Sequence, residues 1–260
     1  MKTLVLIYHN VVESNNDLHL YDVSLDDFRK QIVLLKSPSH HITTSPSHKD
    51  TQSHVLFTTP YTQHPTPLSI VLTFDDGYKS WANNVLDILN EAGLKAYFFI
   101  CIEFIKNGSI SEEDIVKLKD NGMIIGSHGM KHRFLHRLST RELFYELGES
   151  KKLLEGIIHD RIKYFSVPRG MHNRHVLRIA KDLGYERIFT SEIGINKNDD
   201  FVLKRIPIKR NTSLDDFKNI IDGVNINKLS FQQKIKDRAK RMLGIGLYNA
   251  LRRSLIFKVE

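Results

Sequence analysis

The chain has 260 residues, of which 41% are hydrophobic, with a net charge of +8 and a single cysteine. This length and composition are typical of one large α/β domain with a sizeable core, and one cysteine excludes an intramolecular disulfide framework. The apolar neighbours of Cys101 in A-Y-F-F-I-C-I indicate a buried thiol rather than a nucleophile.

The positive charge is concentrated at the C-terminus. From residue 228 onward, nine Lys or Arg residues stand against two acidic ones, so the preceding residues are close to neutral. A nucleic-acid-binding core would need its own basic face or reading motif, and we therefore expect no nucleic acid partner. The N-terminal run M-K-T-L-V-L-I-Y-H-N is too short for a signal-peptide core, and no run approaches the length that spans a bilayer. We expect a cytoplasmic protein.

Strand-like and helical segments alternate along the chain. The predicted strands are residues 3–8, 69–74, 95–100, 123–127, 162–167, 185–190 and 203–208. Predicted helix N-caps are Ser24, Ser111, Ser139 and Asn173, and predicted C-caps are Gly93, Gly122 and Gly184. Repeated β/α units predict a parallel sheet, and seven of them favour a barrel over an open sheet. Functional residues should then lie just past the carboxyl ends of the strands.

Residues 36–68 interrupt this pattern. They are rich in Ser, Thr, Pro and His and have little hydrophobic periodicity, which predicts a long variable loop. A metal-binding tract is the alternative for the histidines of this segment, but their irregular spacing favours the loop. These histidines are His40, His41, His48, His54 and His64.

Candidate metal ligands follow two of the predicted strands. Asp75 and Asp76 end the run S-I-V-L-T-F, and adjacent carboxylates repel each other unless they are exposed or a positive group lies between them. His128 and His132 follow the strand at 123–127, and their spacing predicts two imidazoles on one face of a helical turn. Two imidazoles and one carboxylate leave coordination positions for water and substrate, as in a catalytic metal site.

At these residues the sequence resembles the polysaccharide deacetylase family, whose NodB-homology domains hydrolyse acetyl groups from amino-sugar polymers. T-F-D-D-G resembles the first motif of that family, S-H-G-M-K-H the second and F-S-V-P-R-G, at 165–170, the third. The resemblance covers roughly residues 3–222 and implies a distorted (β/α)7 barrel.

The resemblance also implies roles for individual residues. Asp75 would be the general base, while Asp76, His128 and His132 would hold a divalent metal, with zinc expected and cobalt or nickel as alternatives. Chemically, the metal would acidify a bound water and Asp75 would take its proton. A backbone N–H in the V-P-R-G turn, at Arg169, would help to stabilise the oxyanion.

The chain departs from the family pattern in three places. Ser166 stands where the third motif often has an arginine that orients the base, and Arg169 lies three residues on. The tryptophan of the fourth motif is not visible, since the sole tryptophan is Trp81. No histidine follows His175 to serve as the general acid of the fifth motif. Some family members carry this histidine on an N-terminal Y-H, which L-I-Y-H-N resembles, so His9 is the candidate acid; a surface histidine is the alternative.

Other polar residues near the expected mouth have no firm role. His136 and His172 are expected at the rim rather than as ligands, and Arg174 and Tyr78 are candidates for the lining of a sugar cleft. Beyond the barrel at 1–225, residues 226–260 predict a basic amphipathic helix that lies on an anionic membrane surface at the inner face; packing against the barrel is the alternative.

The leading functional hypothesis is a metal-dependent deacetylase, a hydrolase of non-peptide C–N bonds, acting on N-acetylated sugars of a glycan or a lipid-linked precursor. The alternative is a non-catalytic carbohydrate-binding relative of the family, suggested by Ser166 and the missing motifs. A glycoside hydrolase is disfavoured because adjacent carboxylates cannot straddle a glycosidic bond at a separation of roughly 5–9 Å.

Overall fold

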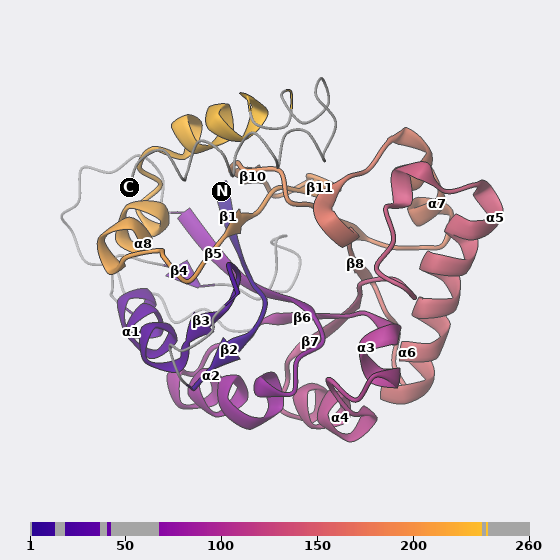
Figure 1. Cartoon of the computed structure of the whole chain (residues 1–260), viewed down its shortest axis with the longest axis horizontal. Coiled ribbons are helices and arrows are strands. Elements are labelled where there is room, and N and C mark those ends of the chain that lie inside the picture. The colour runs from indigo at the N-terminus through magenta and orange to yellow at the C-terminus, as the bar shows by residue number, and fades with distance from the viewer. Residues whose placement is uncertain (1, 14–18, 37–40, 43–67, 236–237, 239–260) are drawn as a thin grey trace.

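The computed structural model describes residues 2–13, 19–36, 41–42, 68–235 and 238. A mostly parallel sheet curves into a nearly closed barrel, and helices cover its outside (Figure 1). The strand order is β10-β1-β5-β6-β7-β8-β9-β11, with β12 added to β1 and β4 added to β5. The predicted α/β distorted barrel is therefore confirmed.

The elements follow one another as strand and helix along most of the chain. The strands are β1 (Lys2–Tyr8), β2 (Val11–Val12), β3 (Val23–Ser24), β4 (His41–Ile42), β5 (Leu68–Asp76), β6 (Tyr97–Ile100), β7 (Ile124–Ser127), β8 (Tyr164–Ser166), β9 (Arg187–Phe189), β10 (Asn196–Lys197), β11 (Val202–Leu203) and β12 (Ile206–Pro207). The α-helices are α1 (Leu25–Leu35), α2 (Leu86–Ala92), α3 (Ile102–Lys106), α4 (Glu112–Asp120), α5 (Thr140–Leu143), α6 (Ser150–Ile158), α7 (Arg174–Asp182) and α8 (Leu214–Ile221). Wider or tighter turns are η1 (Trp81–Val85), η2 (Leu135–Arg137), η3 (Phe144–Glu149) and η4 (Pro168–Gly170).

The parallel register brings the carboxyl ends of the central strands to one rim of the barrel. Asp76 at the end of β5 pairs with Ile100 of β6, and Ile100 pairs with Ser127 of β7. The chain therefore places the two aspartates of β5 close to the loop that begins at His128. The two aspartates are the last two residues of β5 and do not lie beyond the strand.

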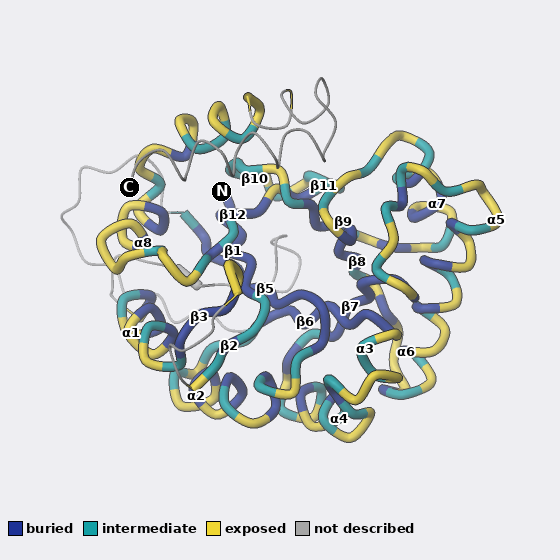
Figure 2. Tube along the Cα trace, viewed as in Figure 1, coloured by how far each residue is buried: buried dark blue, intermediate teal, exposed yellow. Residues whose placement is uncertain are grey.

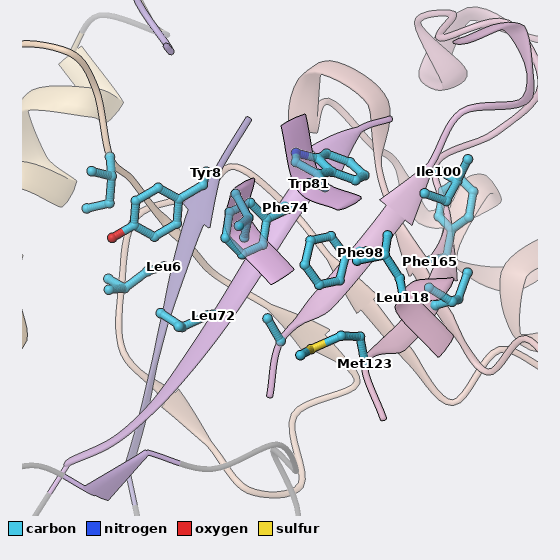
Figure 3. Close-up of a cluster of buried hydrophobic side chains, with 14 of the residues drawn as sticks. Leu6, Tyr8, Leu72, Phe74, Trp81, Phe98, Ile100, Leu118, Met123 and Phe165 are labelled. Atoms are coloured by element: carbon cyan, nitrogen blue, oxygen red, sulfur yellow. The ribbon is translucent and has the colours of Figure 1, made fainter. Parts of the chain in front are cut away.

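Alternating side chains of the strands form two separate cores, which follows from the period of two in a β-strand. The larger core lies between the sheet and the helices, and Figure 3 shows part of it, including Tyr8, Phe74 and Trp81. The barrel interior has its own small cluster. Its members are Val5, Val71, Tyr97, Phe99, Phe189 and Leu203. The buried tube of the central strands in Figure 2 is dark blue along most of its length.

Local signals placed the helix ends correctly. The side chains of Ser24, Ser111, Ser139 and Asn173 each accept a backbone hydrogen bond as an N-cap. The glycines at 93, 122 and 184 have the positive φ angles, 69°, 76° and 77°, of left-handed C-caps.

Two predicted segments differ from the structure. The strand expected at 203–208 is split into β11 and β12, because the chain crosses there from β9 to β1. The loop expected at 36–68 contains the short strand β4, which pairs with β5. Most of that segment, including His40, His48, His54 and His64, lies outside the described residues.

Residues 226–235 are helical and rest on the barrel. The side-chain amide of Gln233 accepts from the Ile193 backbone N–H at 2.7 Å and donates to the Ser191 carbonyl at 2.6 Å. Phe231 and Ile235 are exposed on this helix, at 65% and 54%. Residues 236–237 and 239–260 lie outside the described part, and within that part no helix is both long and apolar enough to cross a membrane.

Candidate active site

Asp76 and the two histidines of the loop after β7 form a cluster at the carboxyl rim of the barrel. One ligand atom from each of the three residues lies within 4.8 Å of the others. Nε2 of His128 is 3.4 Å from Oδ1 of Asp76, and Nε2 of His132 is 3.3 Å from the same oxygen. The fold thus brings the three predicted ligands together, two from one loop and one from a neighbouring strand.

The atoms of this cluster fit a divalent metal. Oδ1 of Asp76 is buried and receives no hydrogen bond from any described group, which is costly unless something else satisfies it. Nδ1 of His128 lies 2.9 Å from the Ser166 carbonyl oxygen. Because a carbonyl can only accept, Nδ1 carries a proton, so in the neutral ring Nε2 is the atom left free to bind a cation beside Asp76. Two imidazole nitrogens and a carboxylate oxygen suit zinc and similar ions.

Electrostatics keep the Asp76 carboxylate charged. Burial alone would raise the pKa of Asp76, but the imidazoles of His128 and His132 outweigh burial and hold the pKa far below its usual value. Burial likewise opposes the protonated form of His128, yet the charges of Asp75 and Asp76 raise its pKa in the metal-free protein. A bound cation would replace that proton between the same groups.

The backbone at the cluster is not helical, so the predicted helical turn at 128–132 is wrong. Gly129 and His132 have φ angles of 83° and 49°, and the loop bonds to neighbouring elements rather than to itself. On the other side, Asp76 has φ 92° and Gly77 φ 127°. A Cβ on Gly77 would lie 3.1 Å from Cγ2 of Ile110, so glycine permits the sharp turn after the two aspartates.

Asp75 is held by an arginine that sequence reasoning missed. Nη1 of Arg205 donates to Oδ1 of Asp75 at 2.8 Å, and Nη2 donates to Oδ2 at 2.7 Å. The Ser166 hydroxyl also donates to Oδ2, at 2.8 Å, and receives a bond from Nη2 of Arg205 at 2.8 Å. Both partners of this pair are buried in the upper part of the barrel interior.

This pairing defines what Asp75 can do. Burial raises the pKa of Asp75, but the Arg205 charge and hydrogen bonds outweigh burial and lower it below the usual value. The carboxylate therefore stays ionised at neutral pH. Of its roughly four lone-pair positions, three are used, and the remaining one on Oδ1 can accept a proton. Oδ2 lies 3.9 Å from Nε2 of His128, so Asp75 and the ligand cluster are neighbours.

Arg205 lies in the short link between β11 and β12, where the barrel nearly closes. Its Nε donates to the Thr190 carbonyl at 2.9 Å and its Nη1 to the Thr73 hydroxyl at 3.1 Å, so the guanidinium has partners on every side. The sequence did contain a signal: an arginine in the apolar run L-K-R-I-P-I, within a predicted strand, has to be paired if it faces the interior.

Arg169 takes a different position from Arg205. Its guanidinium stacks on the Phe134 ring, 4.5 Å from the ring centre, and its side chain is exposed. Its backbone has φ 59° directly after Pro168, at the end of β8. Arg205, not Arg169, contacts the Asp75 carboxylate, while an oxyanion role for the Arg169 N–H stays a prediction.

His9 lies at the same rim, just after β1, as predicted from its place at a strand end. Its Nδ1 is buried and has no partner among the described residues, and its ring lies 4.9 Å from that of Tyr21. Trp81, the first residue of η1, donates from Nε1 to the His9 carbonyl at 2.8 Å. Burial lowers the pKa of His9, while the charges of Asp76 and Asp75 oppose this effect.

The remaining candidates lie around this cluster. Tyr78 donates its hydroxyl to Oδ2 of Asp76 at 3.3 Å, so it borders the metal site. The His136 carbonyl accepts from Asn173, and Nδ1 of His172 is 3.3 Å from the Gly170 carbonyl. Neither imidazole belongs to the three-residue cluster found among the described residues.

Known proteins resemble this chain in both sequence and structure. Residues 62–188 match the sequence profile of the polysaccharide deacetylase family. The chain belongs to the polysaccharide deacetylase family. YxkH of Bacillus subtilis (strain 168) is 28% identical over 163 residues, which span 62% of this chain and 58% of YxkH.

Further proteins similar to this chain extend the comparison. The peptidoglycan-N-acetylmuramic acid deacetylase PdaA of B. subtilis (strain 168) is 32% identical over 126 residues, 47% of this chain and 46% of PdaA. The chain thus matches about half the length of these two relatives. The Streptococcus pyogenes deacetylase PplD, solved in complex with acetate, has the same fold, with a TM-score of 0.68, 23% identity and coverage of 83% of this chain and 96% of PplD.

Proposed function

We propose that this chain is a metal-dependent hydrolase that removes acetyl groups from N-acetylated sugars of a glycan or a lipid-linked glycan precursor. One observation carries the proposal: an unsatisfied carboxylate oxygen on Asp76 faces two imidazole nitrogens, and beside it Asp75 is held ionised by Arg205. This combination would place a cation and a base side by side at the carboxyl rim of the barrel.

Each residue has a step to perform. A divalent ion held by Asp76, His128 and His132 would polarise the acetyl carbonyl and lower the pKa of a water molecule. Asp75 accepts the proton of that water as the oxygen bonds to the acetyl carbon. The C–N bond then breaks, and His9 donates a proton to the sugar nitrogen, which releases acetate and a free amine. Arg205 keeps Asp75 ionised and oriented throughout.

The substrate class rests on the relatives. PdaA is named for action on N-acetylmuramic acid in peptidoglycan, and the S. pyogenes structure of PplD holds acetate. These names support an acetylated sugar polymer as the substrate of the present chain. An acetyl group linked to nitrogen, rather than to oxygen, suits a site with a metal, a base and a separate acid, because the leaving amine needs a proton.

The decisive experiment is acetate release from N-acetylated oligosaccharides by the full chain. The protein is first stripped with a chelator and then supplied with Zn²⁺, Co²⁺ or Ni²⁺. We expect acetate release only after metal addition, and its loss in Asp76→Asn and Asp75→Asn. Asp87→Asn, at an exposed position on α2, is the matched control and should behave as wild type. Metal-independent release, or release by Asp75→Asn at the wild-type rate, would refute the mechanism.

The non-catalytic alternative gives a different result in the same assay. It predicts metal binding without acetate release. Ser166 had suggested this alternative, since it stands where the family often has an arginine, but Arg205, in the link between β11 and β12, contacts both Ser166 and Asp75 and brings a positive charge to them. A reducing-end assay on the same samples would detect glycoside cleavage, which we do not expect.

The predicted contact of residues 226–260 with an anionic membrane, and the cytoplasmic location, stay proposals, because most of that segment lies outside the described residues. The exposed Phe231 and Ile235 support an apolar face on its described part. Co-sedimentation with phosphatidylglycerol vesicles, comparing the full chain with Phe231→Ser/Ile235→Ser, tests the contact. Equal sedimentation of both proteins would count against it.

A further inference from the structure

Glu146 is a fully buried acid that the proposed reaction does not use. It lies in η3, and its Oε2 accepts the backbone N–H groups of Met130 at 2.9 Å and Lys131 at 3.0 Å. Its Oε1 has no hydrogen-bond partner among the described residues. Burying a carboxylate is costly unless hydrogen bonds compensate for the lost hydration, so this position needs a reason.

The two amides belong to the three-residue bridge that connects His128 to His132. The remaining residue of the bridge, Gly129, donates its N–H to the Ser127 hydroxyl at 3.1 Å instead. The successive N–H groups of Met130 and Lys131 converge on one carboxylate oxygen, and successive amides of this kind bind anions. A Cβ on Gly129 would lie only 3.2 Å from Oε2 of Glu146. Glycine therefore lets the carboxylate of Glu146 approach the bridge closely.

The opposite side of the bridge is fixed as well. The carbonyl of Gly129 accepts from the Ile102 N–H at 3.1 Å, and the carbonyl of Met130 accepts from the Glu103 N–H at 3.0 Å. These donors begin α3. The bridge is thus fastened through its carbonyls to α3 and through its amides to Glu146. The attachment to Glu146 comes from a side-chain carboxylate, so it can be removed by substitution, whereas the Ile102 and Glu103 donors are backbone groups.

Glu146 is itself held in place by a buried network of hydroxyl groups. Its carbonyl accepts from the Ser150 hydroxyl at 2.6 Å, and that hydroxyl lies 2.7 Å from the hydroxyl of Ser127. The next carbonyl, of Leu147, accepts from the Tyr185 hydroxyl at 2.8 Å. The wide π-type turn η3 leaves these carbonyls available, and such turns are frequent at functional sites.

We propose that Glu146 is a positioning residue for the metal site. It holds the bridge in the conformation in which Nε2 of His128 and Nε2 of His132 converge on Asp76. The inference rests on the proposed metal site and adds a specific dependence: without the Glu146 carboxylate, the two amides lose their acceptor in a buried position. The bridge then relaxes, and the imidazoles are no longer preorganised for one cation.

The test is calorimetric titration of Co²⁺ into the metal-free full chain, with the Co²⁺ absorption spectrum recorded in parallel. Glu146→Ala should weaken Co²⁺ binding about 10- to 100-fold, the usual effect of losing a group that orients metal ligands, and should change the spectrum. Glu146→Gln keeps an oxygen acceptor on a side chain of the same length and should lie closer to wild type. Equal affinity and equal spectra for wild type and Glu146→Ala would overturn the inference.

Two controls separate positioning from general loosening. Glu149→Gln changes the charge at an exposed position of the same turn, and Leu154→Ala creates a cavity in α6. Both should bind Co²⁺ as wild type does. A loss in Leu154→Ala as large as that in Glu146→Ala would overturn the inference. Absence of Co²⁺ binding in wild type would instead refute the metal site of the proposed function.

Hydrogen exchange tests the inference on the wild-type chain alone, so this test does not depend on whether a variant folds. Hydrogen exchange of the Met130 and Lys131 amides in the metal-free chain should be slow, because both are bonded to Glu146 before any metal arrives. Exchange at the rate of an unprotected loop would show that the bridge is not preformed and would overturn the inference.

Discussion

Arg205 donates hydrogen bonds from both terminal nitrogens to the two carboxylate oxygens of Asp75, at 2.8 Å and 2.7 Å, although the two residues are 130 positions apart in sequence. The pair joins the link between β11 and β12 to the end of β5 across the barrel interior. It therefore connects the closing strands of the barrel with Asp75, the proposed base.

Replacing Arg205 should damage stability and activity together. Arg205→Met leaves the Asp75 carboxylate buried without its cation, which costs about 3–5 kcal/mol when one partner of a buried pair is removed. Urea unfolding of the metal-free chain measures this loss, and acetate release should fall with it. Arg29→Met, at an exposed position on α1, is the control. An unfolding free energy within about 0.5 kcal/mol of wild type would contradict the prediction.

The Asp75 pair should also make the protein sensitive to acid. The folded pKa of Asp75 is lowered, so its stabilising effect is fully present above the unfolded pKa, about 3.9, and is lost as the pH falls through the folded value. Unfolding free energies measured from pH 7 to pH 3 should therefore drop below about pH 4. Asp75→Asn should show a shallower drop, and an identical pH dependence in both proteins would count against this assignment.

His9 should be required for turnover but not for metal binding. If it donates the proton to the leaving amine, His9→Ala should lower kcat about 10²- to 10⁴-fold while the metal Kd stays unchanged. The alkaline fall of the kcat profile should disappear in the variant, since that limb reports the acid. His172→Ala, at the rim, is the matched histidine control. Turnover near the wild-type rate in His9→Ala would end the assignment.

Cys101 should be inert in the folded chain. The residue is fully buried, and burial raises the pKa of its thiol to about 11. We expect no reaction with a thiol reagent at pH 8 in native buffer and one equivalent of reaction after unfolding in guanidinium. Rapid labelling of the native chain would show that the β6 end opens to solvent.

The sequence predicted those parts of the structure that depend on neighbouring residues. The N-caps at Ser111 and Ser139 could be read directly because a serine followed three residues later by an acid forms a local capping box. The spacing of His128 and His132 indicated a shared cation, yet suggested a helix. The loop conformation depends on Glu146 and on α3, which are remote in sequence.

The base-orienting arginine illustrates the same limit. Arg205 gave only a weak signal, because its partners Asp75 and Ser166 become neighbours only when the barrel forms. In the linear order of the family motifs, that arginine would lie near Ser166. In the fold, the charge comes instead from Arg205, in the link between β11 and β12.

The family profile ends at residue 188, so Arg205 lies beyond it, and His9 lies before its start at residue 62. A comparison confined to the matched segment would recover Asp75 and the three proposed cation ligands, but it would miss the proposed acid His9 and the Arg205 partner of Asp75. Whether a sequence of this kind lacks an active-site charge should therefore be judged from its three-dimensional structure, because residues outside the matched segment can supply that charge.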